Sequence, residues 1–380
     1  MKKIFKPAFS FKRLAVILLF INLILGLAHY FIFTSLTNNI INEPLQIKTI
    51  GWVLAIGLLS ISIGFITSQA LSKKTLSFFS WSGYIWMGVF HILFFSCLLS
   101  FALTYLLPET ITTSAYFSIW PLYTTPLITL WALWKGLQKP KLVHHYISGP
   151  SALKGIKLVQ ISDLHIGLLH LNQAWLQSIV HRIQKVSPDL IAITGDLVEG
   201  PFHEVAPLLE PLKELKPHLE KFYITGNHEY IHGSGPWEKR LQELGFTSLH
   251  NEHKILKINS ADVMIAGVPD RMVNRFDSKI FSRPDQALKS FERVDYKILL
   301  AHEPASVHDL KKETCDLILS GHTHGGQIFP FGYLVRLVQP VVKGFKTINA
   351  VLVFAHQGTG LWGPPMRWFS QSEIVVITWK

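Results

Sequence analysis

The chain has 380 residues, of which 49% are hydrophobic, and it carries a formal net charge of +11. This charge is uneven, because residues 1–150 hold 11 basic and 2 acidic side chains whereas the remainder holds 25 and 23. The basic excess therefore accompanies an apolar N-terminal part, which fits membrane topology and attraction to anionic lipid and excludes a nucleic-acid partner. The two cysteines, Cys97 and Cys315, lie in different regions and predict no disulfide, which suits a reducing compartment.

Four long apolar stretches follow one another in the first 140 residues. Stretches of about 20 such residues match the thickness of the bilayer hydrocarbon. These stretches are nearly free of charge and rich in Trp and Phe, which favours membrane spans over the alternative, buried helices of a soluble domain. Two prolines in the fourth stretch leave the number of spans open. We expect a transmembrane region over 1–140, an all-α bundle of four helices with spans at 14–33, 51–70, 84–107 and 115–134.

Basic residues mark one side of this bundle, before the first span, between the second and third, and after the fourth. They are Lys2, Lys3, Lys6, Lys12, Arg13, Lys73, Lys74, Lys135, Lys139 and Lys141. The opposite loops carry only Glu43, Lys48 and Glu109. By the positive-inside rule, this predicts a multi-pass inner-membrane protein whose N-terminus and catalytic domain are cytoplasmic. A cleaved signal peptide is the alternative for the first span, but that stretch is long and no small-residue cleavage site follows it.

Residues 141–154, which follow Pro140 and contain Pro150, are predicted to be a short linker. A short linker places the following domain close to the bilayer and favours a membrane-resident or amphiphilic substrate; the alternative is that the spans only anchor the domain. Residues 155–380 are enough for one large domain with a buried core. A helix is expected around 175–183, where apolar residues recur at helical spacing. Apolar runs of strand length occur at 156–161, 190–194, 222–225, 263–268, 297–301, 317–320, 351–355 and 373–379.

Short polar motifs follow five of these runs. They are Asp163-Leu164-His165, Gly195-Asp196, Gly226-Asn227-His228-Glu229, a lone His302, and Gly321-His322-Thr323-His324-Gly325. Apolar strands that stop at Asp, Asn or His indicate a sheet whose strand ends carry charged chemistry at one edge. The five motifs together therefore predict a single site.

Seven residues in these motifs offer carboxylate oxygens, an amide oxygen or imidazole nitrogens, a mixture that suits Mn, Fe or Zn rather than Ca. They are Asp163, His165, Asp196, Asn227, His302, His322 and His324. Seven ligands are too many for one tetrahedral ion. Two divalent ions roughly 3.5–4 Å apart, sharing a carboxylate and a water, would use all seven and clamp an in-line displacement at phosphorus. The expected chemistry is hydrolysis of a phosphoester or phosphoanhydride.

The ordered motifs D-x-H, G-D, G-N-H, H and G-H-x-H resemble those of the calcineurin-like metallophosphoesterase superfamily, over about residues 155 to 380. The resemblance implies an α/β four-layer αββα sandwich after the membrane helices, with two metal ions. It also implies ligand roles. One ion would be held by Asp163, His165 and His324, the other by Asn227, His302 and His322, with Asp196 between them.

His228 is left without a metal in this scheme. A histidine beside two metals can protonate the departing oxygen, because its ordinary pKa lies near the working pH. In the superfamily, an acidic residue three positions after the bridging Asp often orients this histidine, and here that position is Glu199. The expected nucleophile is a hydroxide on the metals, so no Ser or Cys nucleophile is required.

Candidate substrate contacts are fewer. Gly325 and Gly326 would let the backbone approach a bound phosphate closely, or form only a turn. Arg367 follows an apolar segment and would meet a phosphate beside an acyl chain. The alternative is that the apolar residues of this segment, Leu361, Trp362 and Met366, cap the core or touch lipid headgroups.

The spelling Gly-His-Thr-His-Gly-Gly-Gln resembles membrane-associated bacterial phosphoesterases, including the group that cleaves the pyrophosphate of UDP-2,3-diacylglucosamine in lipid A synthesis. The Arg-Gly that follows the bridging Asp in protein Ser/Thr phosphatases is missing, since Gly200 follows Glu199 directly. We predict a membrane-anchored two-metal hydrolase of phosphodiester or pyrophosphate bonds in a lipid-linked or nucleotide-containing substrate. The alternative is a membrane sensor or ligand-binding protein that uses this fold without turnover, against which His228 argues. Nothing in the sequence indicates an oligomeric state.

Overall fold

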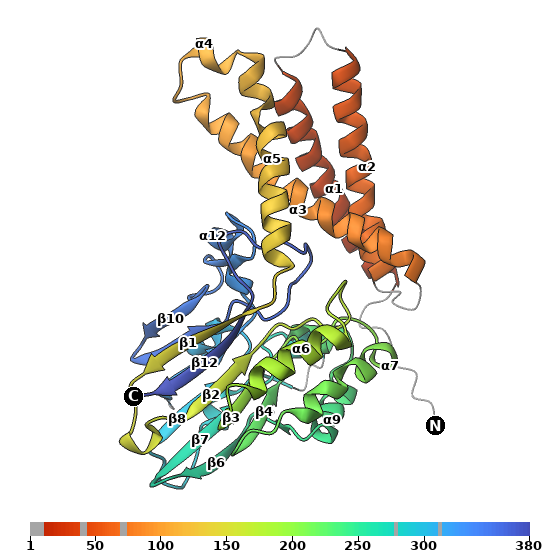
Figure 1. Ribbon diagram of the computed structural model, residues 1–380. Helices are drawn as coiled ribbons and strands as arrows, with labels where there is room; N and C mark the ends of the chain where they lie inside the picture. The colour runs from red at the N-terminus through yellow and green to blue at the C-terminus, as the bar shows by residue number, and fades with distance from the viewer. Residues whose placement is uncertain (1–10, 39–43, 69–73, 277–279, 311–313) are drawn as a thin grey trace. The chain divides into compact units, whose positions relative to one another are not determined.

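The computed structural model of the chain describes residues 11–38, 44–68, 74–276, 280–310 and 314–380. Two compact units make up the chain (Figure 1). The first comprises residues 1–137 together with 363–368, and the second comprises 138–362 together with 369–380. Some residues used in the topology argument, namely those of 1–10, Glu43 and Lys73, lie outside the described residues.

The first unit is helical, and each predicted span overlaps one long helix; the span predicted at 84–107 continues four residues past the end of its helix, and the last two residues of 51–70 lie outside the described residues. The long helices are α1 (Phe11–Thr37), α2 (Pro44–Ser68), α3 (Lys74–Leu103) and α5 (Ala115–Gly136), with the short α4 (Glu109–Thr112) before the last. Within the described residues, α1 from Leu19 onward, α2 and α3 are long and apolar enough to cross a membrane. The stretch predicted as the fourth span is helical, as α5, which contains Pro121 and Pro126, but α5 is not among these candidate membrane helices, so a fourth span stays a prediction.

Contacts within the helical unit are of the kind that hold membrane helices together. Gly64 of α2 faces Gly83 of α3 so closely that a Cβ on either would clash with the backbone of the other. In α1 the buried His29 accepts a hydrogen bond from Trp86 Nε1 at 3.2 Å, and its other ring nitrogen donates to Leu25 O at 2.7 Å. Both ring nitrogens are thus engaged, so this histidine of a candidate membrane helix has a structural role that needs no transport pathway.

The second unit contains two mixed six-stranded sheets. The first sheet has the order β1 (Lys141–Ile147), β12 (Glu373–Trp379), β2 (Lys157–Ile161), β3 (Leu190–Thr194), β4 (Glu220–Ile224) and β5 (Thr247–Ser248). The second has the order β10 (Gly344–Ile348), β11 (Val351–Ala355), β9 (Leu317–Ser320), β8 (Tyr296–Leu300), β7 (Ala261–Gly267) and β6 (Glu252–Ile258). The central strands β2, β3 and β4 run parallel, as do β7, β8, β9 and β11. Parallel strands need both faces covered, which explains their continuous apolar runs.

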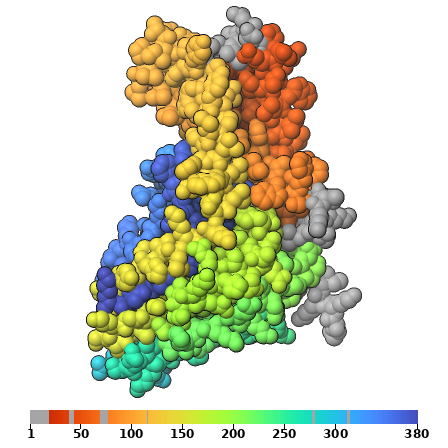
Figure 2. Space-filling model, viewed as in Figure 1, coloured from red at the N-terminus to blue at the C-terminus, as the bar shows by residue number. Residues whose placement is uncertain are grey.

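One apolar core joins the two sheets. Leu158, Leu190 and Phe222 of the first sheet pack in the same buried cluster as Ile298 and Leu317 of the second. On the outer face of the first sheet lies α6 (Gln173–Gln184), whose buried stripe is Leu176, Ile179, Val180 and Ile183. Figure 2 shows α6 and the segments after it as the yellow-green and green surface in front of this sheet. The N-terminus of α6 is capped by the Asn172 side chain, which accepts from Trp175 N.

All eight predicted strands are present, with ends displaced by no more than two residues. The structure differs from the prediction at 141–154, where a linker was expected. Its first half is β1, which pairs in parallel with the whole of β12, from Lys141 opposite Glu373 to Ile147 opposite Trp379. Its second half holds a short 3-10 helix whose Leu153 is buried in the core. This edge strand contains polar residues such as His144 and His145, so it does not form an apolar run in the sequence. Its partner strand is also more than 200 residues away in the sequence.

Candidate metal centre

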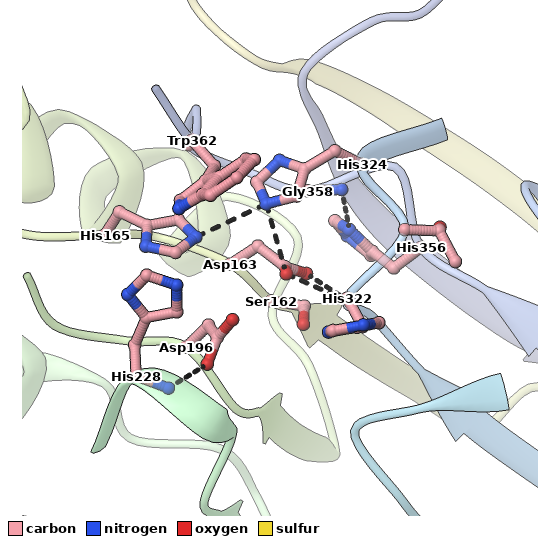
Figure 3. A network of polar contacts seen from close by, with 12 residues as sticks. Ser162, Asp163, His165, Asp196, His228, His322, His324, His356, Gly358 and Trp362 are labelled. Carbon is pink, nitrogen blue, oxygen red and sulfur yellow. Dashed lines mark hydrogen bonds and ion pairs between the residues drawn. The ribbon is translucent and has the colours of Figure 1, made fainter. Parts of the chain in front are cut away.

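The predicted ligands converge at the carboxyl ends of strands from both sheets. Asp163, Asp196 and Asn227 follow β2, β3 and β4 of the first sheet, whereas His302 and His322 follow β8 and β9 of the second. Figure 3 shows side chains from both groups pointing toward one another. The shared core therefore aligns the two sheet edges, and the loops between strand and helix bring the side chains together.

The backbone of these loops is unusual. Left-handed φ angles occur at five of the seven predicted ligands: Asp163 (53°), His165 (47°), Asp196 (51°), His322 (68°) and His324 (48°). Non-glycine residues rarely adopt this conformation, and each instance costs of order 1–3 kcal/mol. Such a concentration at one place indicates that the loops are held for function and are stabilised by the surrounding sheets.

The glycine of each motif permits a close approach. A Cβ on Gly226 would collide with the Asp196 carboxylate, and one on Gly321 would collide with the Asp163 carboxylate. Gly195 has φ +91°, and a Cβ there would lie 2.6 Å from His302 Nδ1. The glycines of G-D, G-N-H and G-H-x-H are therefore explained by the crowding of ligand side chains against backbone.

One cluster able to hold a cation consists of Asp163, His165 and His324, whose ligand atoms lie within 4.8 Å of one another. His165 Nε2 and His324 Nε2 are 3.3 Å apart, and His324 Nε2 is 3.4 Å from Asp163 Oδ1 (Figure 3). The Asp163 carboxylate also accepts from the backbone N–H of His322, at 3.0 and 3.2 Å. This hydrogen bond fixes the carboxylate while its other lone pairs remain available to a cation.

A second cluster consists of Asp196, His302 and His322. His302 Nδ1 donates to Thr194 O at 2.7 Å, which directs Nε2 toward Asp196 Oδ2 at 3.1 Å. Burial would raise the pKa of Asp196, but the nearby His302 and His228 hold it well below its usual range. Burial would lower the pKa of His302, but Asp196 raises it well above the ordinary value. Without metal, a proton on His302 compensates the buried carboxylate, and a divalent ion would compete with that proton.

Asn227 provides an independent test of fit. Its Oδ1 is buried and, among the described residues, has no hydrogen-bond partner. A buried carbonyl oxygen without a partner is costly unless something absent from the protein chain binds it. The other donors of the two clusters are carboxylate oxygens and imidazole nitrogens, which together with this amide oxygen suit divalent transition ions. The residues therefore fit a metal centre.

Glu199 lies at the centre of a group of histidines. Its Oε2 is 2.7 Å from His228 Nδ1 and 3.2 Å from His165 Nδ1, and its Oε1 is 3.2 Å from His232 Nε2. Burial would raise the pKa of Glu199, but these histidines hold it well below its usual range. Burial would lower the pKa of His228, but the charges of Glu199 and Asp196 raise it to about 10. Glu199 thus keeps His228 protonated and orients His165 so that its Nε2 faces the first cluster.

Two residues that contact this site were given no role in the prediction from the sequence. His232 follows His228 by one helical turn on α8 (Asn227–Ile231), a spacing that puts both on one side of the helix. Glu229 was quoted in a motif but given no role. Its fully buried carboxylate accepts from the backbone N–H groups of Asp196 (3.0 Å), Leu197 (2.7 Å), Val198 (3.3 Å) and Gly226 (2.6 Å). Burial and Asp196 raise the pKa of Glu229, and these N–H donors oppose that shift.

The candidate substrate contacts are placed differently. A Cβ on Gly326 would clash with Gly332, and one on Gly325 would lie 2.8 Å from Gln357 Oε1, so close packing alone accounts for both glycines. Arg367 is buried and belongs to the helical unit, where its backbone N–H donates to Ala132 O at 2.9 Å. The structure does not group Arg367 with the seven ligands, so its role in phosphate binding stays a prediction.

Comparison with known proteins agrees with this centre. The sequence model of the calcineurin-like phosphoesterases matches residues 156–326. An uncharacterized metallophosphoesterase of Aquifex aeolicus is 34% identical over 227 residues, which cover 59% of this chain and 85% of that protein. The chain belongs to the calcineurin-like phosphoesterase family. The match ends close to the last predicted ligand, His324.

Other members of the family are longer than the matched region. A metallophosphoesterase of Helicobacter pylori is 36% identical over 249 residues, covering 64% of this chain and 65% of that protein. A transmembrane protein with metallophosphoesterase domain from Danio rerio is 32% identical over 275 residues, covering 68% of this chain and 62% of that protein. The chain thus spans less than two thirds of the length of these two relatives.

We predict that Glu229→Gln destabilises the metal-ligand loops. An amide nitrogen would replace one oxygen that now accepts from at least two backbone N–H groups, leaving buried donors without partners at a cost of about 1–3 kcal/mol. The melting temperature of the detergent-solubilised protein should fall by several degrees. The same change at the exposed Glu243, which is 3.5 Å from Arg240, should leave it unchanged. Equal melting temperatures for both variants would contradict the anchoring role of Glu229.

Proposed function

We propose that the chain is a two-metal hydrolase of phosphodiester or pyrophosphate bonds in a lipid-linked or nucleotide-containing substrate. The position of Asp196 carries this proposal. Its carboxylate lies within 4.8 Å of ligand nitrogens of His302 and His322 on one side and of His165 on the other. A carboxylate placed between two ligand clusters is what two neighbouring cations need as a shared ligand.

The proposed ligand sets follow from these clusters. Asp163, His165 and His324 would hold one ion, and Asn227, His302 and His322 the other, with Asp196 bound to both. Bound divalent ions would polarise the phosphoryl oxygens and lower the pKa of a water toward about 7. Mn, Fe and Zn all suit this mixture of oxygen and nitrogen donors.

His228 is the proposed general acid. Its Nδ1 faces Glu199, which leaves Nε2–H to donate a proton to the departing oxygen. Trp362 lies edge-on to the imidazole, with ring centroids 6.4 Å apart, and shields it on one side. The alternative of a sensor without turnover has no use for this arrangement, because ligand binding requires no proton donor.

The membrane assignment extends this proposal. Four spans, a four-layer αββα arrangement of the second unit, and cytoplasmic placement of the N-terminus and the metal centre remain our proposals from the sequence. The candidate spans in α1, α2 and α3 support a membrane location, as does the similarity to the transmembrane protein of Danio rerio. A phosphate-containing amphiphile is therefore the proposed substrate class.

Metal removal tests the central proposal. Purified protein treated with EDTA should lose hydrolysis of an aryl phosphodiester and regain it when Mn is added. Asn227→Ala should bind about one ion per chain instead of two, because it removes a ligand of the second site alone. The control is Asn274→Ala on the exposed surface, which should keep both ions. Metal content measured by mass spectrometry decides the matter, and full occupancy in Asn227→Ala, or hydrolysis that survives EDTA, would contradict the proposal.

A pH profile tests the pairing of Glu199 with His228. The general acid must be protonated, so the rate falls as pH rises through the pKa of His228. The Glu199 charge raises this pKa, and Glu199→Gln should therefore move the alkaline limb of kcat to lower pH by at least about one unit. Glu238→Gln, which changes another carboxylate near a histidine, His250, should leave the limb in place. An unshifted limb in Glu199→Gln would remove His228 from the role of proton donor.

A further inference from the structure

An apolar patch surrounds α12 (Phe331–Val335) in the α/β unit, directly after the last metal-ligand motif. We call it the α12 patch. It consists of Phe329, Phe331, Tyr333, Leu334, Leu337, Val338 and Phe369, all of which are exposed. Leu337 is 81% exposed and Val338 72%. Elsewhere in the described part of this unit, exposed large apolar side chains stand singly along the chain, as Phe291 does, and single ones need no explanation.

The patch is ordered by contacts of its own. Phe329 lies 6.0 Å from Tyr333 and 5.3 Å from Phe369, measured between ring centroids. After α12 the chain continues in turns, with Leu337 N–H donating to Leu334 O and Val338 N–H to Val335 O, both at 3.1 Å. Helical spacing therefore places Tyr333 beside Leu337 and Leu334 beside Val338. Ring contacts thus group Phe329, Tyr333 and Phe369, and helical spacing adds the aliphatic side chains beside Tyr333.

The chain segment that carries the patch holds charge of one sign. No Asp or Glu occurs between Asp316 and Glu373, whereas Arg336, Lys343 and Lys346 lie in this interval and are exposed. Lys343 Nζ donates to Phe369 O at 2.9 Å, which places a cation at the edge of the patch. Exposed aromatic and aliphatic side chains bordered by cations match the interface of a bilayer that contains anionic lipid.

The patch also connects to the metal centre. Gln327 follows the ligand His324 and binds the backbone of Trp362, donating to Trp362 O at 2.7 Å and accepting from Trp362 N–H at 3.1 Å. Trp362 is half exposed and lies against His228. Gln327 O also accepts from Ser370 Oγ at 2.7 Å, beside Phe369 of the patch. One hydrogen-bonded segment thus supports both the patch and the rim of the centre.

We propose that the α12 patch docks on the surface of an anionic bilayer. A membrane is the occupant that the chain makes available, because the described residues include candidate membrane helices and β1 of the α/β unit begins five residues after α5, the proposed fourth span, ends. Apolar side chains at 333, 334, 337 and 338 enter the headgroup region, and the cations meet lipid phosphates. Docking presents the rim at Trp362 to molecules that lie in the bilayer surface. This last consequence rests on the proposed function and specifies its substrate as a phosphate-containing amphiphile.

Fluorescence quenching tests the docking without reference to activity. The full chain carrying Leu337→Cys is labelled with bimane and reconstituted in nanodiscs of phosphatidylcholine and phosphatidylglycerol; both native cysteines are buried and stay unlabelled. Nitroxide on the lipid chains should quench this label about twofold or more, and iodide in the water should quench it weakly. The control label is placed at Phe291→Cys, a position outside the patch whose side chain is 98% exposed. Iodide should quench this label strongly, and lipid nitroxide should quench it weakly.

Tyr333→Cys gives a second position should Leu337→Cys fail to fold. A label at 337 or 333 that iodide quenches as strongly as the control label, with no effect of lipid nitroxide, overturns the proposal. So does a symmetric cross-link between two copies through Leu337→Cys, because the patch would then be a dimer interface.

Hydrolysis separates this inference from the proposed function. The double change Leu337→Asp and Val338→Asp should lower hydrolysis of a phosphate diester amphiphile in vesicles about tenfold and leave that of a soluble aryl phosphodiester unchanged. If lipid nitroxide quenches the label but neither substrate is hydrolysed, docking stands and the proposed function fails. If the double variant hydrolyses both substrates as fast as the unchanged protein does, docking does not serve the substrate and this part of the inference is wrong.

Discussion

The main constraint on the α/β unit is that its buried carboxylate, imidazole and amide groups must be held close together at one place. Two buried carboxylates, Asp163 and Asp196, converge with four imidazoles and the oxygen of Asn227, and among the described residues that oxygen has no hydrogen-bond partner. Protons can compensate part of this charge, as the raised pKa of His302 indicates. Divalent cations held by these ligands would compensate the rest and would also satisfy the amide oxygen. The loops, the glycines and the surrounding carboxylates are all understandable as means of holding this arrangement in place.

Two glutamates outside the ligand set hold these loops and side chains in place. Glu229 accepts hydrogen bonds from four backbone N–H groups and thereby fixes the loop that carries Asp196. Glu199 contacts three imidazoles and so links His165, a proposed metal ligand, to His228, the proposed proton donor. A single carboxylate therefore sets both the ligand orientation and the protonation of the acid. The core shared by the two sheets supplies the stability that offsets left-handed backbone at five ligands.

The sequence predicted the parts whose signal is local. Apolar runs located the eight strands, and the motifs at their ends named all the residues that the two metal clusters contain. Structural features that depend on residues distant in the sequence were not predicted. β1 is stabilised by β12 at the other end of the chain, and Glu229 acts on backbone groups about 30 residues earlier, so neither has a pattern of its own. The sequence near Arg367 gave no information on which unit this residue joins, and its role in phosphate binding stays a prediction.

The most direct test is anomalous X-ray diffraction from crystals of the protein loaded with Mn or Zn. The account predicts two metal peaks about 3.5–4 Å apart, with Asp196 bound to both and Asn227 Oδ1 bound to one. A single peak, or two peaks of which neither contacts Asp196, would contradict it.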